Sequence, residues 1–219
     1  MADHTFRDLE TAAYCPRKLY YRRRDGAPEI PEAVAKRRAL AREYERLLDD
    51  DAALLAAPIE PDPATVRERL RAARDRLDLW DGLVDPAETD VYLAGKDARG
   101  IAHKLVGTDD GRIPSLVFTG RPPEQGLWEP QSVRLVAAAK ALSWERERPV
   151  ERAVAEYPAY GVVREIEMTA RRSGQYRRAL RVAESIDGPP ARTDNDAKCE
   201  PCDYREQCGV RTRSLRSLL

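Results

Sequence analysis

The four cysteines of this chain are spaced in a way that suits one metal centre. Two of them, Cys199 and Cys202, form a Cys-x-x-Cys knuckle, and Cys208 follows after five residues. Such a knuckle can present two thiolates to the same metal while the intervening backbone folds round it. Cys15 is the one other cysteine in the sequence, so we expect it to supply the fourth ligand from the opposite end of the chain.

The spacing alone does not choose the metal, because zinc and iron–sulfur clusters both accept four thiolates. Judged on spacing only, zinc is the favoured ion. A redox-active Cys-x-x-Cys together with two unrelated buried cysteines is the alternative that needs no metal.

The overall composition excludes several classes of protein. No apolar run is long enough to span a bilayer, and the start of the chain, Met1 to Thr5, lacks the basic region and apolar stretch of a signal peptide. We therefore expect a cytoplasmic protein without a membrane partner, whose cysteines stay reduced and available to metals. The 38 basic and 38 acidic residues cancel, so any nucleic-acid site must be a local patch.

The elements that must position these cysteines fall into two kinds. The first 85 residues show helical patterns, and we expect helices over 5–13 and 16–24, from Pro31 through Leu48, and from Asp62 to Trp80. Short strands follow, at 91–93, 101–106, 113–118, 153–157 and 162–168. Helices are expected over 130–147 and 175–186, and a polar loop over 187–198 leads to the last three cysteines.

This order of elements predicts an α/β protein with a single domain over 1–219. A helical region, 1–85, carries Cys15, and an α/β core occupies 86–190. A cysteine-bearing segment with a basic tail follows at 191–219. The sequence from Thr108 to Gly111 is a turn signal that should join two of the strands as a hairpin.

The stretch Cys15-Pro16-Arg17-Lys18-Leu19-Tyr20-Tyr21, taken with the Cys-x2-Cys-x5-Cys pattern near the end, resembles the CRISPR-associated Cas four exonuclease family. Members are RecB-like nucleases of antiviral defence with the PD-(D/E)XK fold, and they hold a 4Fe–4S cluster on four cysteines so placed. The resemblance implies that fold and a 4Fe–4S cluster, and it implies DNA and CRISPR adaptation proteins as partners. It implies these cluster ligands: Cys15, Cys199, Cys202 and Cys208.

Two further stretches are similar to the nuclease motifs of that family, but their ionisable residues are changed. The stretch 100–105 is similar to a glycine-x-x-aspartate strand, and 113–124 is similar to a strand and loop with glutamate-x-lysine. The aspartate position is occupied by His103, the glutamate position by Leu116 and the lysine position by Phe118. The histidine of the family's preceding helix falls at Arg42, and the glutamine and tyrosine of its following helix fall at Arg134 and Ala138.

A nuclease of this kind binds a divalent ion between the aspartate and the glutamate, while the lysine positions the attacking water. Leu116 and Phe118 lie two residues apart on a strand, so they should face the same side and fill the metal pocket with apolar atoms. We therefore expect no catalytic residues and no active-site divalent ion, and we expect His103 to be hydrogen-bonded rather than metal-bound.

Two other functions remain open from the sequence. An active metal-dependent exonuclease of spacer acquisition could use a relocated site, although Asp109 and Asp110 fit a turn and Asp97 fits a solvated loop. A zinc-stabilised interaction protein is the other alternative.

Basic residues flank both ends of the cysteine pattern. One group follows Cys15 and the other follows Cys208, so the two could form a phosphate-binding rim round the metal or an ordinary solvated surface. Tyr20 and Tyr21 are expected to pack against the metal site rather than stack on bases. The basic residues are Arg17, Lys18, Arg22, Arg23, Arg24, Arg211, Arg213 and Arg216.

Overall fold

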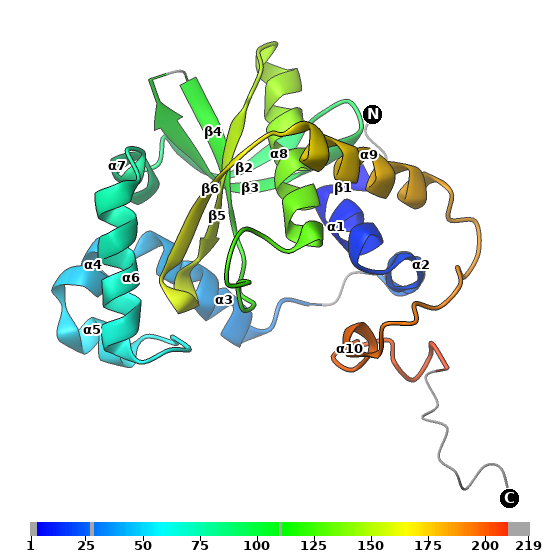
Figure 1. The fold of residues 1–219 in the computed structure, drawn as a ribbon, viewed down its shortest axis with the longest axis horizontal. Helices are drawn as coiled ribbons and strands as arrows, with labels where there is room; N and C mark the ends of the chain where they lie inside the picture. Colours follow the sequence, from blue (N-terminus) through cyan, green and yellow to red (C-terminus); the bar gives the residue numbers. More distant parts are fainter. Residues whose placement is uncertain (1–3, 27–28, 110, 210–219) are drawn as a thin grey trace, which may run out of the picture.

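A mixed β-sheet forms the centre of the computed structural model, which describes residues 4–26, 29–109 and 111–209 (Figure 1). Within these residues the strand order is β1-β3-β4-β5-β6, and β2 pairs with β3. The predicted α/β class is confirmed. The strands are β1 (His4–Thr5), β2 (Glu88–Ala94), β3 (Ala98–Thr108), β4 (Gly111–Val117), β5 (Arg152–Tyr157) and β6 (Val162–Glu167).

Helices cover both faces of the sheet. One face packs against α1 (Phe6–Tyr14), α8 (Glu129–Arg146) and α9 (Ala170–Glu184). The other packs against η1 (Leu40–Arg42), α4 (Tyr44–Asp49), α6 (Pro63–Arg76) and α7 (Trp80–Val84). The other helices are α2 (Pro16–Asp25), α3 (Glu32–Ala39), α5 (Asp51–Ala56), η2 (Pro158–Tyr160) and α10 (Asp196–Cys199).

Alternation along β4 separates the two cores. Leu116 belongs to the buried cluster beneath α1 and α8, whereas its neighbour Val117 belongs to the cluster beneath α6. Strands β4 and β5 are parallel, so the chain must cross over between them, and α8 makes that crossing. Both ends of β4 are thereby fixed by neighbouring strands and by α8.

Gly100 allows α1 to lie close against β3. A Cβ atom at this position would lie 2.5 Å from Cδ2 of Phe6, the first residue of α1, which is far inside van der Waals contact. Thr5 starts the helix with a capping box, in which its side chain accepts from the N–H of Asp8 and the Asp8 side chain accepts from the N–H of Thr5. The close approach fixes the start of α1 against β3, and Cys15 follows the other end of the same helix.

Several predicted boundaries are wrong for tertiary reasons. The helix predicted from Pro31 is broken into α3, η1 and α4, because Glu43 leaves the helical region of backbone space. The helix capped by Asp62 ends at Arg76, and Trp80 instead begins α7, where its ring stacks on Tyr44 and its Nε1 donates to Glu45. These contacts between elements outweigh the continuous helical periodicity.

The C-terminal half also differs from expectation in places. Helix α9 begins at Ala170, ahead of the predicted start at 175, because the Thr169 side chain caps it by accepting from the N–H of Arg172. The segment predicted as a loop before the last three cysteines contains the short helix α10. Strand β1, which pairs in parallel with β3, had no recognisable pattern in the sequence.

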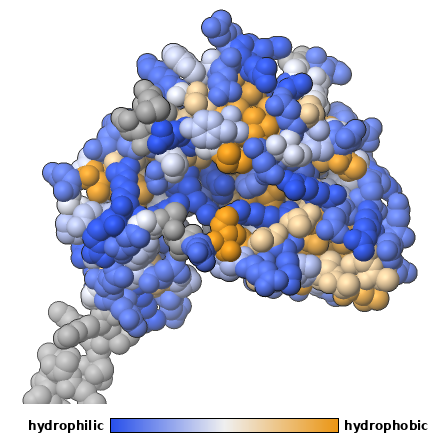
Figure 2. All heavy atoms as spheres, turned by 180° about the vertical axis from the view of Figure 1, so that it is seen from behind, coloured by the Kyte–Doolittle hydropathy of each residue, from blue (hydrophilic) through white to orange (hydrophobic). Residues whose placement is uncertain are grey.

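Most of the surface seen in Figure 2 is hydrophilic, and the apolar residues on that face form separate patches. None of the helices in the described parts of the chain is both long enough and apolar enough to cross a bilayer.

Candidate functional site

The four cysteines line one small cavity. They come from the start of α2 and from the segment around α10, two parts of the chain that lie near each other in Figure 1. Cys15 is the residue at which α1 ends and α2 begins, and Cys199 is the last residue of α10. Cys202 follows the turn after α10, and Cys208 lies in a later turn. The structure therefore brings together all four residues that the sequence analysis singled out, from the two ends of the chain.

Backbone hydrogen bonds fix the main chain at three of the four cysteines. The N–H of Cys15 donates to the carbonyl of Thr11 at 2.8 Å, which closes α1, and proline at the next position starts α2. The N–H of Cys202 donates to the carbonyl of Cys199 at 3.1 Å, so the Cys-x-x-Cys knuckle is a tight turn. The N–H of Cys208 donates to the carbonyl of Tyr204 at 2.8 Å.

Two tyrosines hold the C-terminal segment against α1 and α2. The Tyr14 hydroxyl donates to the carbonyl of Lys198 at 2.9 Å, and the Lys198 ammonium donates back to the carbonyl of Tyr14 at 2.9 Å. The Tyr21 hydroxyl donates to the carbonyl of Gln207 at 3.1 Å, and its ring stacks on Tyr204. Tyr21 is buried and lines the cysteine cavity, whereas Tyr20 is not among the residues of its lining.

Positive side chains surround the cysteines, and none of the described residues that line the cavity is acidic. Burial raises the pKa of the Cys199 thiol, and the neighbouring Cys15 and Cys208 raise it further, because like charges disfavour one another. A cationic group inside the cavity would reverse that balance and favour the thiolates. The basic residues of the lining are Arg17, Lys18, Arg192, Lys198 and Arg205.

All four cysteines are free thiols. Across the described residues, no three side chains of His, Cys, Asp or Glu form a group that could hold a single metal ion. The ligand role of the cysteines therefore stays a prediction, although the cavity places them around one space.

The sheet face that carries Leu116 and Phe118 is the second region of interest. Both residues are buried in the same core cluster, as their alternation predicted, and the Phe118 ring stacks on Tyr157 at 5.5 Å. His103 accepts a hydrogen bond at Nδ1 from the N–H of Val117 at 3.0 Å, so its predicted hydrogen-bonded role is confirmed. Burial and the nearby Arg134 lower the pKa of His103 from 6.5 to about 3, so the imidazole is neutral at neutral pH.

The expectation of an apolar pocket is wrong at the edge of this face, because charged residues surround His103. Arg134 is only 8% exposed, and its guanidinium lies over the ring of Phe118 at 5.6 Å. The nearby Glu10 on α1 accepts from Arg134 at 3.4 Å. Arg134 lies within the apolar run of α8, beside buried Val133 and Leu135. A charged residue in such a run is the feature of the sequence that could have indicated the charged surroundings of His103.

The remaining positions from the sequence analysis lie in varied surroundings. Ala138 is buried in the α8 core, and Arg42 is exposed and pairs with Asp90. Asp97 lies in the loop between β2 and β3, as predicted, but it is partly buried and accepts from the Tyr176 hydroxyl at 3.3 Å. Asp109 is exposed beside the β3–β4 turn, and Asp110 lies outside the described residues.

The basic residues of α2 do not form one continuous rim. Arg17 donates to the carbonyl of Pro190 at 2.8 Å and Arg23 to that of Ala183 at 2.8 Å, so both brace later segments of the chain. Three more α2 side chains have other partners: Lys18 pairs with Asp203, Arg24 with Asp25, and Arg22 is 3.4 Å from the Thr11 hydroxyl. The basic residues of the tail, Arg211, Arg213 and Arg216, lie outside the described residues.

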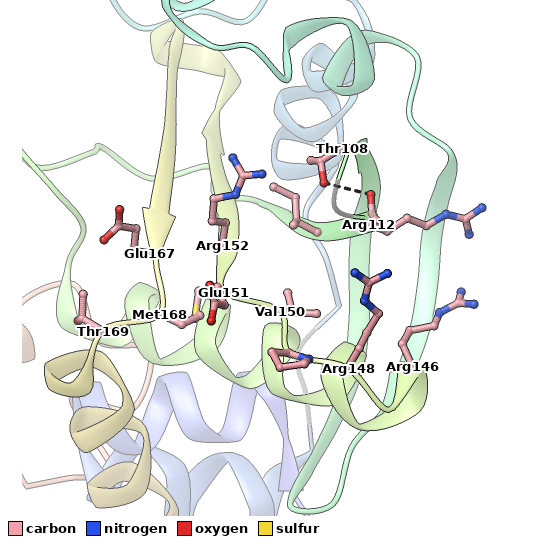
Figure 3. Close-up of a pocket in the computed structure, with 13 residues that line it drawn as sticks. Thr108, Arg112, Arg146, Arg148, Val150, Glu151, Arg152, Glu167, Met168 and Thr169 are labelled. Atoms are coloured by element: carbon pink, nitrogen blue, oxygen red, sulfur yellow. Dashed lines mark hydrogen bonds between the residues drawn. The ribbon is translucent and has the colours of Figure 1, made fainter.

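A separate cavity opens where β4, β5 and the end of α8 approach one another (Figure 3). Arg112, Arg146 and Arg148 lie on one side of it, with Glu151 and Glu167 opposite. These three arginines are exposed, and two of them, Arg112 and Arg146, pair with Glu88. This cavity shares no residue with the cysteine cavity, and its charges are largely those of a solvated surface.

The chain matches no family model, and no curated protein matches it significantly.

Proposed function

We propose that this protein holds a 4Fe–4S cluster on its four cysteines and acts as a non-cleaving, DNA-binding or partner-binding protein of the RecB-like, Cas-four-like type. The observation that carries the proposal is the shared cavity of Cys15, Cys199, Cys202 and Cys208, which joins residues more than 180 positions apart. The cluster's role is to tie the C-terminal segment to α1 and α2.

A cluster suits this cavity because each of its irons takes one thiolate, so the sulfurs need only surround it. Four thiolates and the cluster together carry net negative charge, and five basic side chains line the same cavity. The tyrosine contacts of Tyr14 and Tyr21 hold the segment in place from two sides.

The same proposal includes the loss of nuclease chemistry. Magnesium and manganese ions bind oxygen ligands, and Leu116 and Phe118 offer none. His103 uses Nδ1 for the Val117 N–H and carries no charge at neutral pH. Further support comes from the order of elements, in which β3 and β4 form a hairpin and are followed by α8, as the resemblance to the RecB-like fold requires.

The cluster is tested on protein purified without oxygen from iron-supplemented cells. The natural chain should be brown, with visible charge-transfer absorbance and with about four irons and four labile sulfides per chain. Cys15→Ser should lose iron and lower the melting temperature, because metal binding is coupled to folding. Thr193→Ala is the matched control, since Thr193 lines the cavity without being a proposed ligand, and it should keep the cluster.

If the natural chain contains zinc and no iron, the proposed cluster is wrong and the protein is instead a zinc-stabilised interaction protein. A chain with neither metal would overturn the proposal.

The nuclease part is tested with magnesium and manganese on single-stranded and duplex DNA. We expect no cleavage by the natural chain. The triple variant His103→Asp, Leu116→Glu and Phe118→Lys should regain weak cleavage, whereas each single change should not, because these groups act as a unit. Cleavage by the natural chain that Asp97→Asn abolishes would show that the active site has moved rather than disappeared.

A further inference from the structure

Four arginines from four helices meet beside the sheet face that carries His103. Arg7 is on α1, Arg22 on α2, Arg38 on α3 and Arg134 on α8. Arg7, Arg22 and Arg38 line one cavity, and the positive charges of these three lower the pKa of Arg134 after the larger effect of its burial. We call these four residues the arginine pocket.

One carboxylate, that of Glu10, lies close to two of these arginines. Glu10 lies between two of the arginines, with an oxygen 3.4 Å from Nη1 of Arg134 and 3.9 Å from Nε of Arg7. The first distance is long for a charge-assisted hydrogen bond, which is usually about 2.7–2.9 Å. Glu10 therefore offsets part of the charge without satisfying either guanidinium.

The other guanidiniums have weaker partners still. Arg38 makes no hydrogen bond or ion pair with any described residue, and its Nε is buried without an acceptor. The buried Nε of Arg134 also lacks a partner in the described parts of the chain. Arg22 donates to the hydroxyl of Thr11 at a long distance, 3.4 Å. Buried donors without acceptors are unusual in folded proteins. The Nη atoms of Arg38 are not among the buried ones, and Arg38 lines the cavity, so an oxyanion there would contact this guanidinium through its outer nitrogens.

Most of the other carboxylates nearby are engaged elsewhere. Among those that line the same cavity, Glu129 pairs with Arg178 and Asp203 with Lys18, while Glu29 lies on its wall. Asp8 accepts from the N–H of Thr5 in the cap of α1, and Asp90 pairs with Arg42. Arginine keeps its charge even when its pKa is lowered, so the arginine pocket has a net positive charge.

The cavity in front of the arginine pocket is large enough for a nucleotide. Its volume is about 980 Å³, at the upper end of the range for ligand sites. Trp128 and Ile30 form an apolar part of the wall, and both side chains are more than half exposed. The indole N–H of Trp128 donates to the carbonyl of Arg121 at 3.0 Å, which holds the ring in place. Guanidinium groups bind backbone phosphates, and an aromatic ring held in place stacks on a base. Together they suit a single-stranded nucleic acid.

We propose that the arginine pocket binds a backbone phosphate of single-stranded DNA, with a neighbouring base against Trp128. This inference rests on the proposed role of the protein in DNA binding, and it assigns the residues that contact the strand. Where a nuclease would bind phosphate through a divalent ion between carboxylates, this chain presents arginines that bind the phosphate directly. The proposal concerns binding alone, and no bond is formed or broken.

The test measures binding of a fluorescein-labelled oligothymidylate by anisotropy over a series of salt concentrations. Arg38→Gln should weaken binding about tenfold or more, since it removes a charge-assisted contact. It should also reduce the slope of log affinity against log salt by about 0.7 for each lost phosphate contact. Arg71→Gln, on the exposed side of α6, makes the same charge change elsewhere and should leave both values unchanged.

Two further variants separate the contacts. Arg134→Gln should also weaken binding, because it removes a positive charge behind the cavity wall, and its melting curve shows whether the buried change has unfolded the protein. Trp128→Ala should weaken binding about 5-fold or more without changing the salt slope, because stacking releases no counterions. Calorimetry with inorganic phosphate and with thymidine monophosphate tests the phosphate chemistry apart from the strand.

The outcomes are distinct. DNA binding that Arg38→Gln and Arg134→Gln leave at the level of Arg71→Gln would overturn the arginine pocket, while the proposed DNA-binding function would stand. Binding of phosphate or the mononucleotide without binding of the oligothymidylate would overturn the assignment to a DNA strand and the DNA-binding function together. Binding of none of the three probes would overturn both as well.

Discussion

Replacing Lys104 with methionine should destabilise the protein strongly, because it would leave Glu156 buried without its counter-charge. The two side chains are 2% and 0% exposed, and Nζ lies 2.8 Å from Oε2 of Glu156. Nζ also donates to the carbonyls of Ala41 at 2.6 Å and Leu83 at 2.8 Å, while Ser115 donates to the other oxygen of Glu156. The pair thus joins η1 and α7 to the sheet.

The size of the effect follows from this burial. Removing one partner of a buried ion pair costs about 3–5 kcal/mol. In a chain of this length each kcal/mol moves the melting temperature by about 2–4 °C, so we expect a loss of roughly 6–20 °C for Lys104→Met. The double variant Lys104→Met with Glu156→Leu removes both charges, and it should cost clearly less than the sum of the two single variants.

Urea unfolding followed by circular dichroism measures the four corners of this cycle. Glu32→Gln is the control, because the ion pair of Glu32 with Lys36 is 81% and 65% exposed and should contribute less than about 0.5 kcal/mol. A loss below about 1 kcal/mol for Lys104→Met, or single losses that simply add, would refute the assignment of a coupled buried pair.

Two further predictions concern β3. The pKa of His103 is about 3 in the folded protein against 6.5 ordinarily, so only the unfolded chain gains this proton as pH falls below 6.5. The free energy of unfolding should therefore fall by about 1.4 kcal/mol for each pH unit between about pH 6 and 4. Urea titrations of His103→Gln should show a slope of unfolding free energy against pH that is smaller by that amount. An unchanged slope would contradict the lowered pKa of His103. Gly100→Ala should cost about 1–3 kcal/mol through its clash with Phe6, whereas Gly107→Ala on the same strand meets no atom within 4 Å; equal losses on thermal unfolding would argue against the clash.

Local features of the chain could be predicted from residue types alone. Pro16 at the start of α2 and the Asp62 cap of α6 are signals that act within one helical turn, and both are observed. The hairpin at Thr108 to Gly111 and the shared face of Leu116 and Phe118 follow in the same way from turn chemistry and strand alternation. The cysteine spacing also pointed to one site before any fold was known.

The arginine pocket depended on the tertiary structure. Its members stand at positions 7, 22, 38 and 134 on separate helices, and no spacing rule relates residues so far apart. The neutrality of His103 has the same origin, since its low pKa comes from burial and from arginines on other elements. Helix and strand signals act over a few residues of chain, whereas Coulomb interactions depend on distance in space, which only packing sets.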